Sequence, residues 1–146
     1  MTPPTPLVDP LIKEIADYVG TKLNAAYPTA TMVRSVEYYD TYNVPISEFP
    51  LLKVSRSTDV FSLDTDMRQG QITLSYCLAN VAMPQLPGIN NFVSTSVVQA
   101  LREFQITKQR VIELGSQISV RYRPMFQIGA GLIYQIDFSL SLKESG

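Results

Sequence analysis

The fold is decided by residues 132–143, LIYQIDFSLSLK, in which apolar and polar residues alternate. Successive side chains of a β-strand point to opposite faces of a sheet, whereas a helix would spread the same apolar residues around its circumference. The alternation therefore predicts one long strand, at about residues 132–142, with a dry face and a wet face. The wet face carries the polar side chains of Gln135, Asp137, Ser139 and Ser141.

A second alternating run, residues 71–79, predicts a strand of the same kind. Two such strands indicate an antiparallel sheet that is covered on one face only. Two amphipathic helices would supply the cover, because apolar residues recur at helical spacing over about residues 10–26 and 89–104. Asp9 and Pro10 are residue types preferred at a helix N-cap and at the first helical position.

Shorter signals complete a predicted order of helix, three strands, helix and two strands. They are strands at about residues 31–39, 51–57 and 118–122, a long loop or projecting hairpin at 57–70, breaks at Pro84, Pro87 and Gly88, turns at 115–116 and 129–131, and a frayed end from residue 143. This order predicts a single α+β domain over residues 7–146, with one mainly antiparallel sheet and both helices on its dry face. A proline-rich arm, residues 1–6, precedes it and is expected to be extended.

The composition excludes several classes of catalytic site. The chain has no histidine, which removes the commonest general base and every Ser-His or Cys-His nucleophile pair. Cys77 is the single cysteine, so an intrachain disulfide and a thiolate-rich zinc site are both excluded, and its place on a strand predicts a structural thiol. No run approaches the roughly 18 apolar residues of a membrane span, and the first residues lack the features of a signal peptide. We expect a soluble protein with no membrane partner.

Asp64 and Asp66 form the closest pair of carboxylates in the chain. They could hold a hard cation such as magnesium or calcium, and a small metal-dependent enzyme would hold its metal with Asp59, Asp64 or Asp66. Aspartates are also common in turns, where they bond their own backbone, and we favour this interpretation. The glycines at 129 and 131 are too few for a nucleotide-binding fingerprint. We therefore expect no catalytic residue, metal or cofactor.

Charge is unevenly distributed along the chain, although the net charge is only −1. Residues 57–67 hold three aspartates and no base, whereas residues 102–123 hold five cations against two carboxylates, a net charge of +3. These segments could be separate solvated surfaces, or the acidic loop of one subunit could meet the basic segment of the next in a head-to-tail contact that closes a ring. Nucleic-acid binding by the basic segment is a third interpretation, and it has less support because few stacking aromatics are interleaved with the segment. The candidates for the subunit contact are Asp59, Phe61, Leu63, Asp64, Asp66, Arg68, Arg102, Arg110, Arg121 and Arg123.

Three clustered tyrosines, Tyr38, Tyr39 and Tyr42, suggest a different function. Tyrosine is enriched at interfaces, so this cluster could be the contact patch of a monomeric module that binds a peptide or a carbohydrate.

The order of elements, together with several short motifs, resembles a family of bacteriophage proteins. The motifs are Arg68-Gln69-Gly70 leading into the strand at 71–79, Pro124-Met125-Phe126 before the last turn, and Tyr134-Gln135-Ile136-Asp137-Phe138 after it. Over about residues 7–142 the chain resembles the small tail-terminator and head-to-tail completion (neck) proteins of long-tailed bacteriophages.

The resemblance implies a structural virion protein that is assembled in the host cytoplasm. Such a protein forms a homo-hexameric ring at the head-proximal end of the tail, stops growth of the tail tube and joins the tube to neck or connector proteins. DNA passes through the ring without sequence-specific binding, and the family has no catalytic residues to carry over. A neck stopper or adaptor is the alternative. Within such a ring, we expect Gln135, Asp137, Ser139 and Ser141 to face the channel or a neighbouring subunit.

Overall fold

A computed structural model of the chain describes residues 9–37, 46–108, 112–128 and 131–145. The predictions for the arm at 1–6, for Tyr38, Tyr39 and Tyr42, and for Arg110 fall outside these residues. The elements are α1 (Pro10–Ala26), β1 (Ser35–Glu37), the short 3-10 helix η2 (Ile46–Glu48), β2 (Leu51–Phe61), β3 (Met67–Ala79), a second 3-10 helix η3 (Met83–Gln85), α2 (Leu86–Lys108), β4 (Ile112–Tyr122), β5 (Phe126–Ile128) and β6 (Gly131–Ser145).

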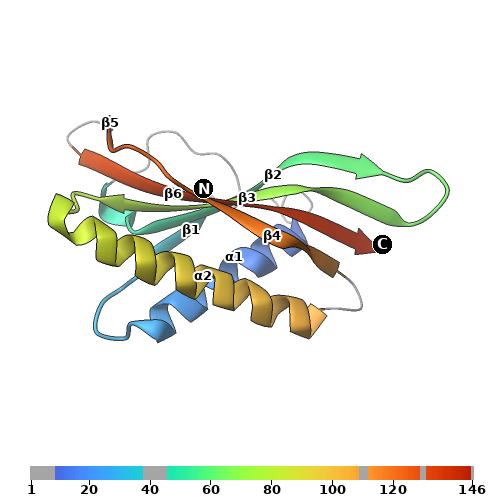
Figure 1. Cartoon of the computed structure of the whole chain (residues 1–146), viewed down its shortest axis with the longest axis horizontal. Helices are drawn as coiled ribbons and strands as arrows, with labels where there is room; N and C mark the ends of the chain where they lie inside the picture. Colours follow the sequence, from blue (N-terminus) through green and yellow to red (C-terminus); the bar gives the residue numbers. More distant parts are fainter. Residues whose placement is uncertain (1–8, 38–45, 109–111, 129–130, 146) are drawn as a thin grey trace.

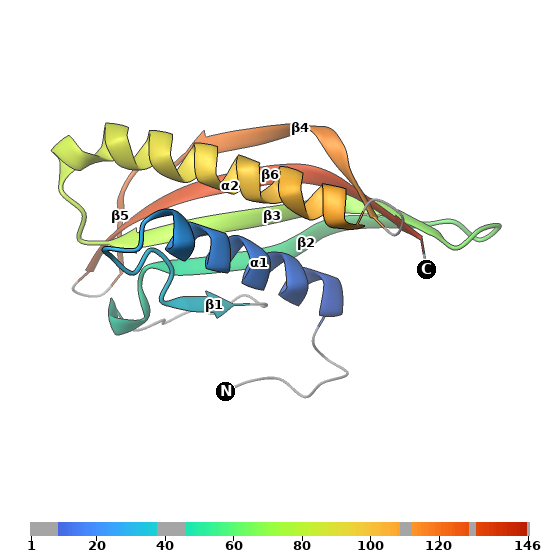
Figure 2. The same cartoon turned by 90° about the horizontal axis from the view of Figure 1, so that it is seen from below.

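The strands form one mixed sheet in the order β1-β2-β3-β6-β4, and β5 pairs with one end of β6. β1 runs parallel to β2, while the other pairs are antiparallel. Figures 1 and 2 show α1 and α2 side by side on one face of this sheet. The α+β class, the order of the main elements and the placement of both helices are therefore confirmed.

The core lies between the two helices and the covered face of the sheet. Ile15, Val19 and Leu23 of α1 are fully buried there, as are the apolar side chains on the facing side of α2. Across the sheet, Leu74 of β3 lies opposite Phe138 of β6, and both side chains are 0% exposed. The period-two pattern thus places alternate residues of each strand under the helices.

Local chemistry fixes the two ends of α1. The Asp9 carboxylate accepts hydrogen bonds from the backbone N–H groups of Leu11 and Ile12, which otherwise lack partners at a helix start. Near the other end, the Asn24 side chain accepts hydrogen bonds from the N–H groups of Met32 and Val33. These bonds return the chain from the helix to the sheet edge at β1.

Residues 57–70 form a projecting hairpin, the second of the two predicted alternatives. β2 and β3 remain paired from Leu51↔Cys77 out to Phe61↔Arg68, so only residues 62–66 lie between the strands. A β-bulge between Arg56 and Thr58 interrupts the register, which explains why simple alternation underestimates the length of β2.

Several predicted boundaries are wrong. α2 begins at Leu86, because Pro87 and Gly88 lie in its first turn, where a missing N–H costs nothing. The predicted turn at 115–116 is a β-bulge within β4, between Leu114 and Ile118. β6 does not fray at residue 143, since it stays paired with β3 as far as Met67↔Ser145. β1 begins at Ser35, four residues after the predicted start at residue 31, and the short strand β5 was not predicted.

The alternation also fails at the start of β6. Leu132 is 43% exposed, whereas Ile133, assigned to the wet face, is 1% exposed. Ile133 packs with Leu51 and Cys77 in a small apolar cluster on the second face of the sheet. This face is therefore apolar at one end and polar along the rest of its length.

Candidate functional site

The β2–β3 hairpin extends well past the helices at one end of the sheet (Figure 2). Its tip, which we define as residues 60–66, exposes three apolar side chains. Val60 is 71% exposed, Phe61 is 62% exposed and Leu63 is fully exposed at 100%. Contiguous apolar residues on a protruding element are typical of a contact surface, because a solvated monomer gains nothing from exposing them.

The loop at the tip is organised by hydroxyl groups. The backbone N–H groups of Asp64 and Thr65 each donate a hydrogen bond to Ser62 Oγ at 3.3 Å, and Ser62 N donates to the Met67 carbonyl at 3.0 Å. The carboxylates of Asp64 and Asp66 are exposed and have no ion-pair partner among the described residues. No group of three or more His, Cys, Asp or Glu that could hold a metal occurs among the described residues either.

Ion pairs brace the base of the hairpin on its helix side. The Arg56 guanidinium contacts the carboxylates of Asp9 at 2.5 Å, Glu144 at 2.9 Å and Asp59 at 3.4 Å. Arg68 then pairs with Asp59 at 2.9 Å. We call Asp9, Arg56, Asp59, Arg68 and Glu144 the brace. It joins the start of α1, both hairpin strands and the end of β6.

The brace favours the ionised forms of Asp9, Arg56 and Asp59. The hydrogen bond from Arg68 is the main cause that lowers the pKa of the Asp59 carboxyl. Burial alone would raise the pKa of Asp9, but hydrogen bonds from Arg56 and from the start of α1 outweigh it, and the pKa is lowered. Burial opposes the charge of Arg56 in the same way, and its carboxylate partners raise its pKa nonetheless.

The brace therefore gives two of the predicted subunit-contact residues partners within the chain. Asp59 and Arg68 belong to the brace, with side chains that are 21% and 30% exposed. Arg68 also lies over the ring of Phe61, with its guanidinium carbon 4.8 Å from the ring centroid. Phe61, Leu63, Asp64 and Asp66 remain at the tip as outward-facing candidates.

The face of the sheet opposite the helices is the second candidate surface, and we call it the open face. The register aligns Ser55, Thr73, Ser139 and Ser119 in one row across β2, β3, β6 and β4. Each of these side chains is partly or fully exposed. A row of small hydroxyl groups makes the middle of this face flat and polar.

Asp137 is the centre of a hydrogen-bonded cluster on the open face. Its carboxylate accepts hydrogen bonds from Ser75 Oγ and Gln135 Nε2, both at 2.7 Å, and pairs with Arg123 at 3.1 Å. Burial favours a higher pKa for Asp137, but these three donors outweigh it and lower the pKa. The structure thus brings together the predicted Gln135 and Asp137, while Ser139 and Ser141 continue the same face along β6.

Four cations lie on the open face, and they do not come from one segment of the chain. They are Lys53 of β2, Arg121 of β4, Arg123 just after β4, and Lys143 of β6. Among the described residues, only Arg123 of these four has an ion-pair partner. The Asp137 carboxylate lies on the same face, while Glu37 lies opposite Lys53 and Glu113 lies opposite Lys143 in the register. Among the side chains that the structure describes, cations therefore outnumber carboxylates on the open face.

The predicted basic segment is divided between the two faces of the molecule. Arg121 and Arg123 lie on the open face, whereas Arg102 is exposed on α2, on the helix side of the sheet. The sequence interpretation missed Lys53 and Lys143, although the alternation that assigns Leu52 and Val54 to the dry face assigns Lys53 to the other. It also missed Arg56, because nothing local marks a partner near residue 9 or residue 144.

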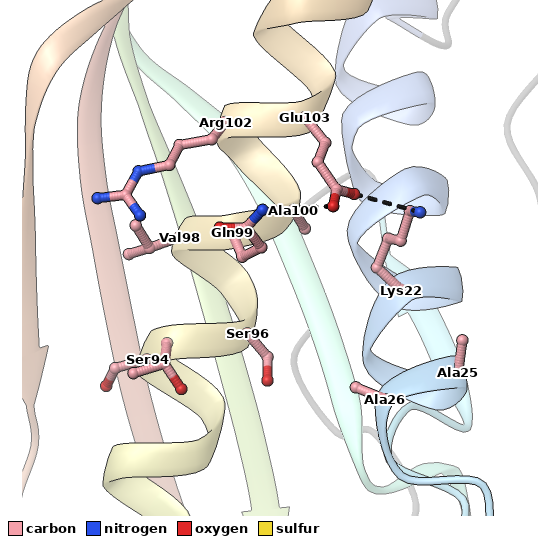
Figure 3. A pocket seen from close by; sticks show the side chains of 11 residues that line it. Lys22, Ala25, Ala26, Ser94, Ser96, Val98, Gln99, Ala100, Arg102 and Glu103 are labelled. Atoms are coloured by element: carbon pink, nitrogen blue, oxygen red, sulfur yellow. Dashed lines mark hydrogen bonds and ion pairs between the residues drawn. The ribbon is translucent and has the colours of Figure 1, made fainter.

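A groove of about 770 Å³ runs between α1 and α2 on the solvent side of the helices. Figure 3 shows Lys22 of α1 reaching Glu103 of α2 across it, and the two groups form an ion pair at 3.2 Å. Arg102 points away from that pair. The remaining lining is mostly alanine, serine and other small or neutral side chains, which offer no convergent charged groups.

Cys77 has the properties expected of a structural thiol. Its side chain is 3% exposed, and burial raises its pKa to about 11. A thiol of this pKa is protonated at neutral pH, so it is a poor nucleophile. Neither helix in the described part of the chain is long and apolar enough to cross a membrane.

Comparison with known sequences adds no family assignment. No protein-family model matches the chain, and no curated protein is significantly similar to it. The hairpin and the open face therefore remain the two surfaces that indicate a function.

Proposed function

We propose that this chain is a structural subunit of a phage virion, a tail terminator that assembles into a ring between the tail tube and the neck. The proposal combines the resemblance described above with two surfaces suited to self-association. In this function the ring caps the tube, contacts neck or connector proteins and leaves a channel for DNA.

The observation that carries the proposal is the braced hairpin with its exposed apolar tip. A mobile loop that orders on binding loses conformational entropy, which weakens the contact. The brace lowers this cost, because Arg56 and Arg68 already fix both strands at the base of the hairpin. A rigid arm that presents Phe61 and Leu63 is thus suited to a repeated contact between subunits.

The experiment measures assembly directly. Light scattering after gel filtration should give the mass of a ring, and electron microscopy should show rings on the ends of tail tubes when the protein is added to tubes that lack a terminator. Leu63→Asp should abolish ring formation, because the ring contact would then bury an unpaired charge. Ile106→Asp is the matched control, since Ile106 is also exposed (71%) but lies on α2.

Three results would count against the proposal. The first is a protein that stays monomeric at all concentrations and does not bind tail tubes. The second is a ring that forms equally well with Leu63→Asp, which would show that the hairpin tip is not part of the subunit contact. The third is binding to isolated necks but not to tubes, which would favour the stopper or adaptor function.

A further inference from the structure

The open face contains a hollow beside the base of the hairpin. It has a volume of about 460 Å³, and its polar lining comes from Thr58, Gln69, Gln71, Ser141 and Lys143. Both β-bulges of the sheet, in β2 and β4, border this region. Bulges often redirect side chains next to functional sites, so a hollow between two of them is a candidate binding site for a partner.

Two glycines line the hollow at positions where a side chain would not fit. A Cβ atom at Gly70 would lie 2.2 Å from the Thr58 carbonyl oxygen, and one at Gly115 would lie 2.2 Å from Ser141 Oγ. Val60 is 71% exposed and adds apolar surface, whereas Leu114 and Leu142 border the hollow from the core and are 6% and 2% exposed. Its chemistry is therefore mixed, with apolar atoms below and polar or cationic groups at the rim.

The hairpin tip has the complementary chemistry. Leu63 is fully exposed, and Asp64 and Asp66 beside it carry two negative charges without an ion-pair partner among the described residues. The open face carries four cations, and one of them, Lys143, lies at the rim of the hollow. Opposite patches of this kind steer association and fix its register.

Leu63 and the two aspartates of the tip cannot reach the hollow of their own chain. The hollow includes Thr58 and Val60 of the same hairpin, and the ladder between β2 and β3 continues to Phe61↔Arg68. Folding the tip back would break this ladder. An occupant with the chemistry of the tip must therefore come from a second copy.

We infer that the hairpin tip of one copy docks on the open face of the next copy, with Leu63 in the hollow and Asp64 and Asp66 toward the cations of that face. This inference rests on the proposed function and names the contact that would build the ring. The donor and acceptor surfaces lie at different places on the chain, so the contact is head-to-tail and can be repeated around a closed ring.

Cross-linking between two single-cysteine additions tests the inference. One chain carries Leu63→Cys and the other carries Ser141→Cys, and the mixture is treated with a short bis-maleimide while its native mass is recorded. Cys77 can remain, because it is buried and its pKa is about 11. The expected product is a cross-linked pair within a ring. Replacing Ser141→Cys by Ile106→Cys is the control, and it should give no product.

Charge reversal provides a second measurement on the intact protein. Arg121→Glu with Lys143→Glu should weaken self-association about tenfold or more, since attraction becomes repulsion. Adding Asp64→Lys and Asp66→Lys to the partner chain should restore it. Recovery in the mixed pair, but not in either variant alone, would support the docking.

The outcomes separate this inference from the proposed function. A ring mass without the 63–141 cross-link, or without charge-reversal recovery, would overturn the docking and leave the ring intact. A monomer in every measurement would overturn both. Duplex DNA is the last alternative. If the wild type binds duplex DNA, and Arg121→Glu with Lys143→Glu abolishes that binding while self-association persists, the open face is a nucleic-acid surface and the docking is overturned.

Discussion

The two halves of the β2–β3 hairpin are stabilised by different forces. In the inner half, pairs such as Leu52↔Tyr76 and Val54↔Leu74 are fully or almost fully buried beneath the helices. In the outer half no helix covers the strands, which are held by the pairing of β3 with β6 and by the brace. Burial is insensitive to pH, whereas ion pairs depend on the charge of each partner. One pair of strands thus combines a permanent part of the core with an arm whose rigidity depends on charge.

The largest effect is expected in the buried part of the sheet. Phe138→Ala should lower the free energy of unfolding by about 3–5 kcal/mol, because it removes a fully buried ring and leaves a cavity. Urea unfolding followed by circular dichroism measures the change. Ser139→Ala is the control, since it alters the next residue on the opposite face and should stay within about 0.5 kcal/mol of wild type. Equal losses in the two variants would contradict the assignment of the faces.

A smaller effect is expected at the brace. Arg56→Met should lower the free energy of unfolding by about 2 kcal/mol, because it leaves the partly buried carboxylates of Asp9 and Glu144 without their main counter-charge. The loss should be concentrated in the outer hairpin, so amides between residues 57 and 70 should exchange faster while those under the helices change less. Arg102→Met on α2 serves as the control. Unchanged exchange in the hairpin would show that the ladder alone keeps it rigid.

The smallest effect is expected from acid within a narrow pH window. The pKa values of Asp9 and Asp59 are lowered from 3.8 by folding, so their stabilisation is complete above that value and is lost as pH falls through the lower folded values. Hairpin protection should therefore be constant from neutral pH to about pH 5 and fall below about pH 4. Hydrogen exchange across this range measures it. Loss of protection near pH 6 would contradict the assignment.

The sequence predicts the covered half of the molecule well. Alternation along residues 132–142 correctly assigns the side chains from Tyr134 to Leu142, because each strand has one buried face and one solvated face. It fails at Ile133, where Leu51 and Cys77 create a second cluster that only the assembled sheet defines. It also fails at the bulge in β2, where one extra residue between Arg56 and Thr58 changes the period without changing the composition.

The candidate surfaces are harder to predict because their residues come from distant segments. The exposed apolar residues and the aspartates of the tip lie together in the sequence, so local reasoning finds them. The cations of the open face come from three strands, and the brace joins residues near 9, 56, 68 and 144. Such groups are brought together by topology, which a single sequence specifies only through the whole fold.

The span of the brace has a consequence for folding kinetics. Its ion pairs connect the N-cap of α1 and the end of β6 through Arg56, and the Arg56–Glu144 pair joins residues that are 88 positions apart (144 − 56). Contacts of such high sequence separation carry the greatest closure entropy and form after local structure has been established. A partly folded chain would therefore have an unbraced arm, and only the fully folded chain would present the tip in the rigid form suited to polymerisation. The same ion pairs would then delay assembly until each subunit has folded completely.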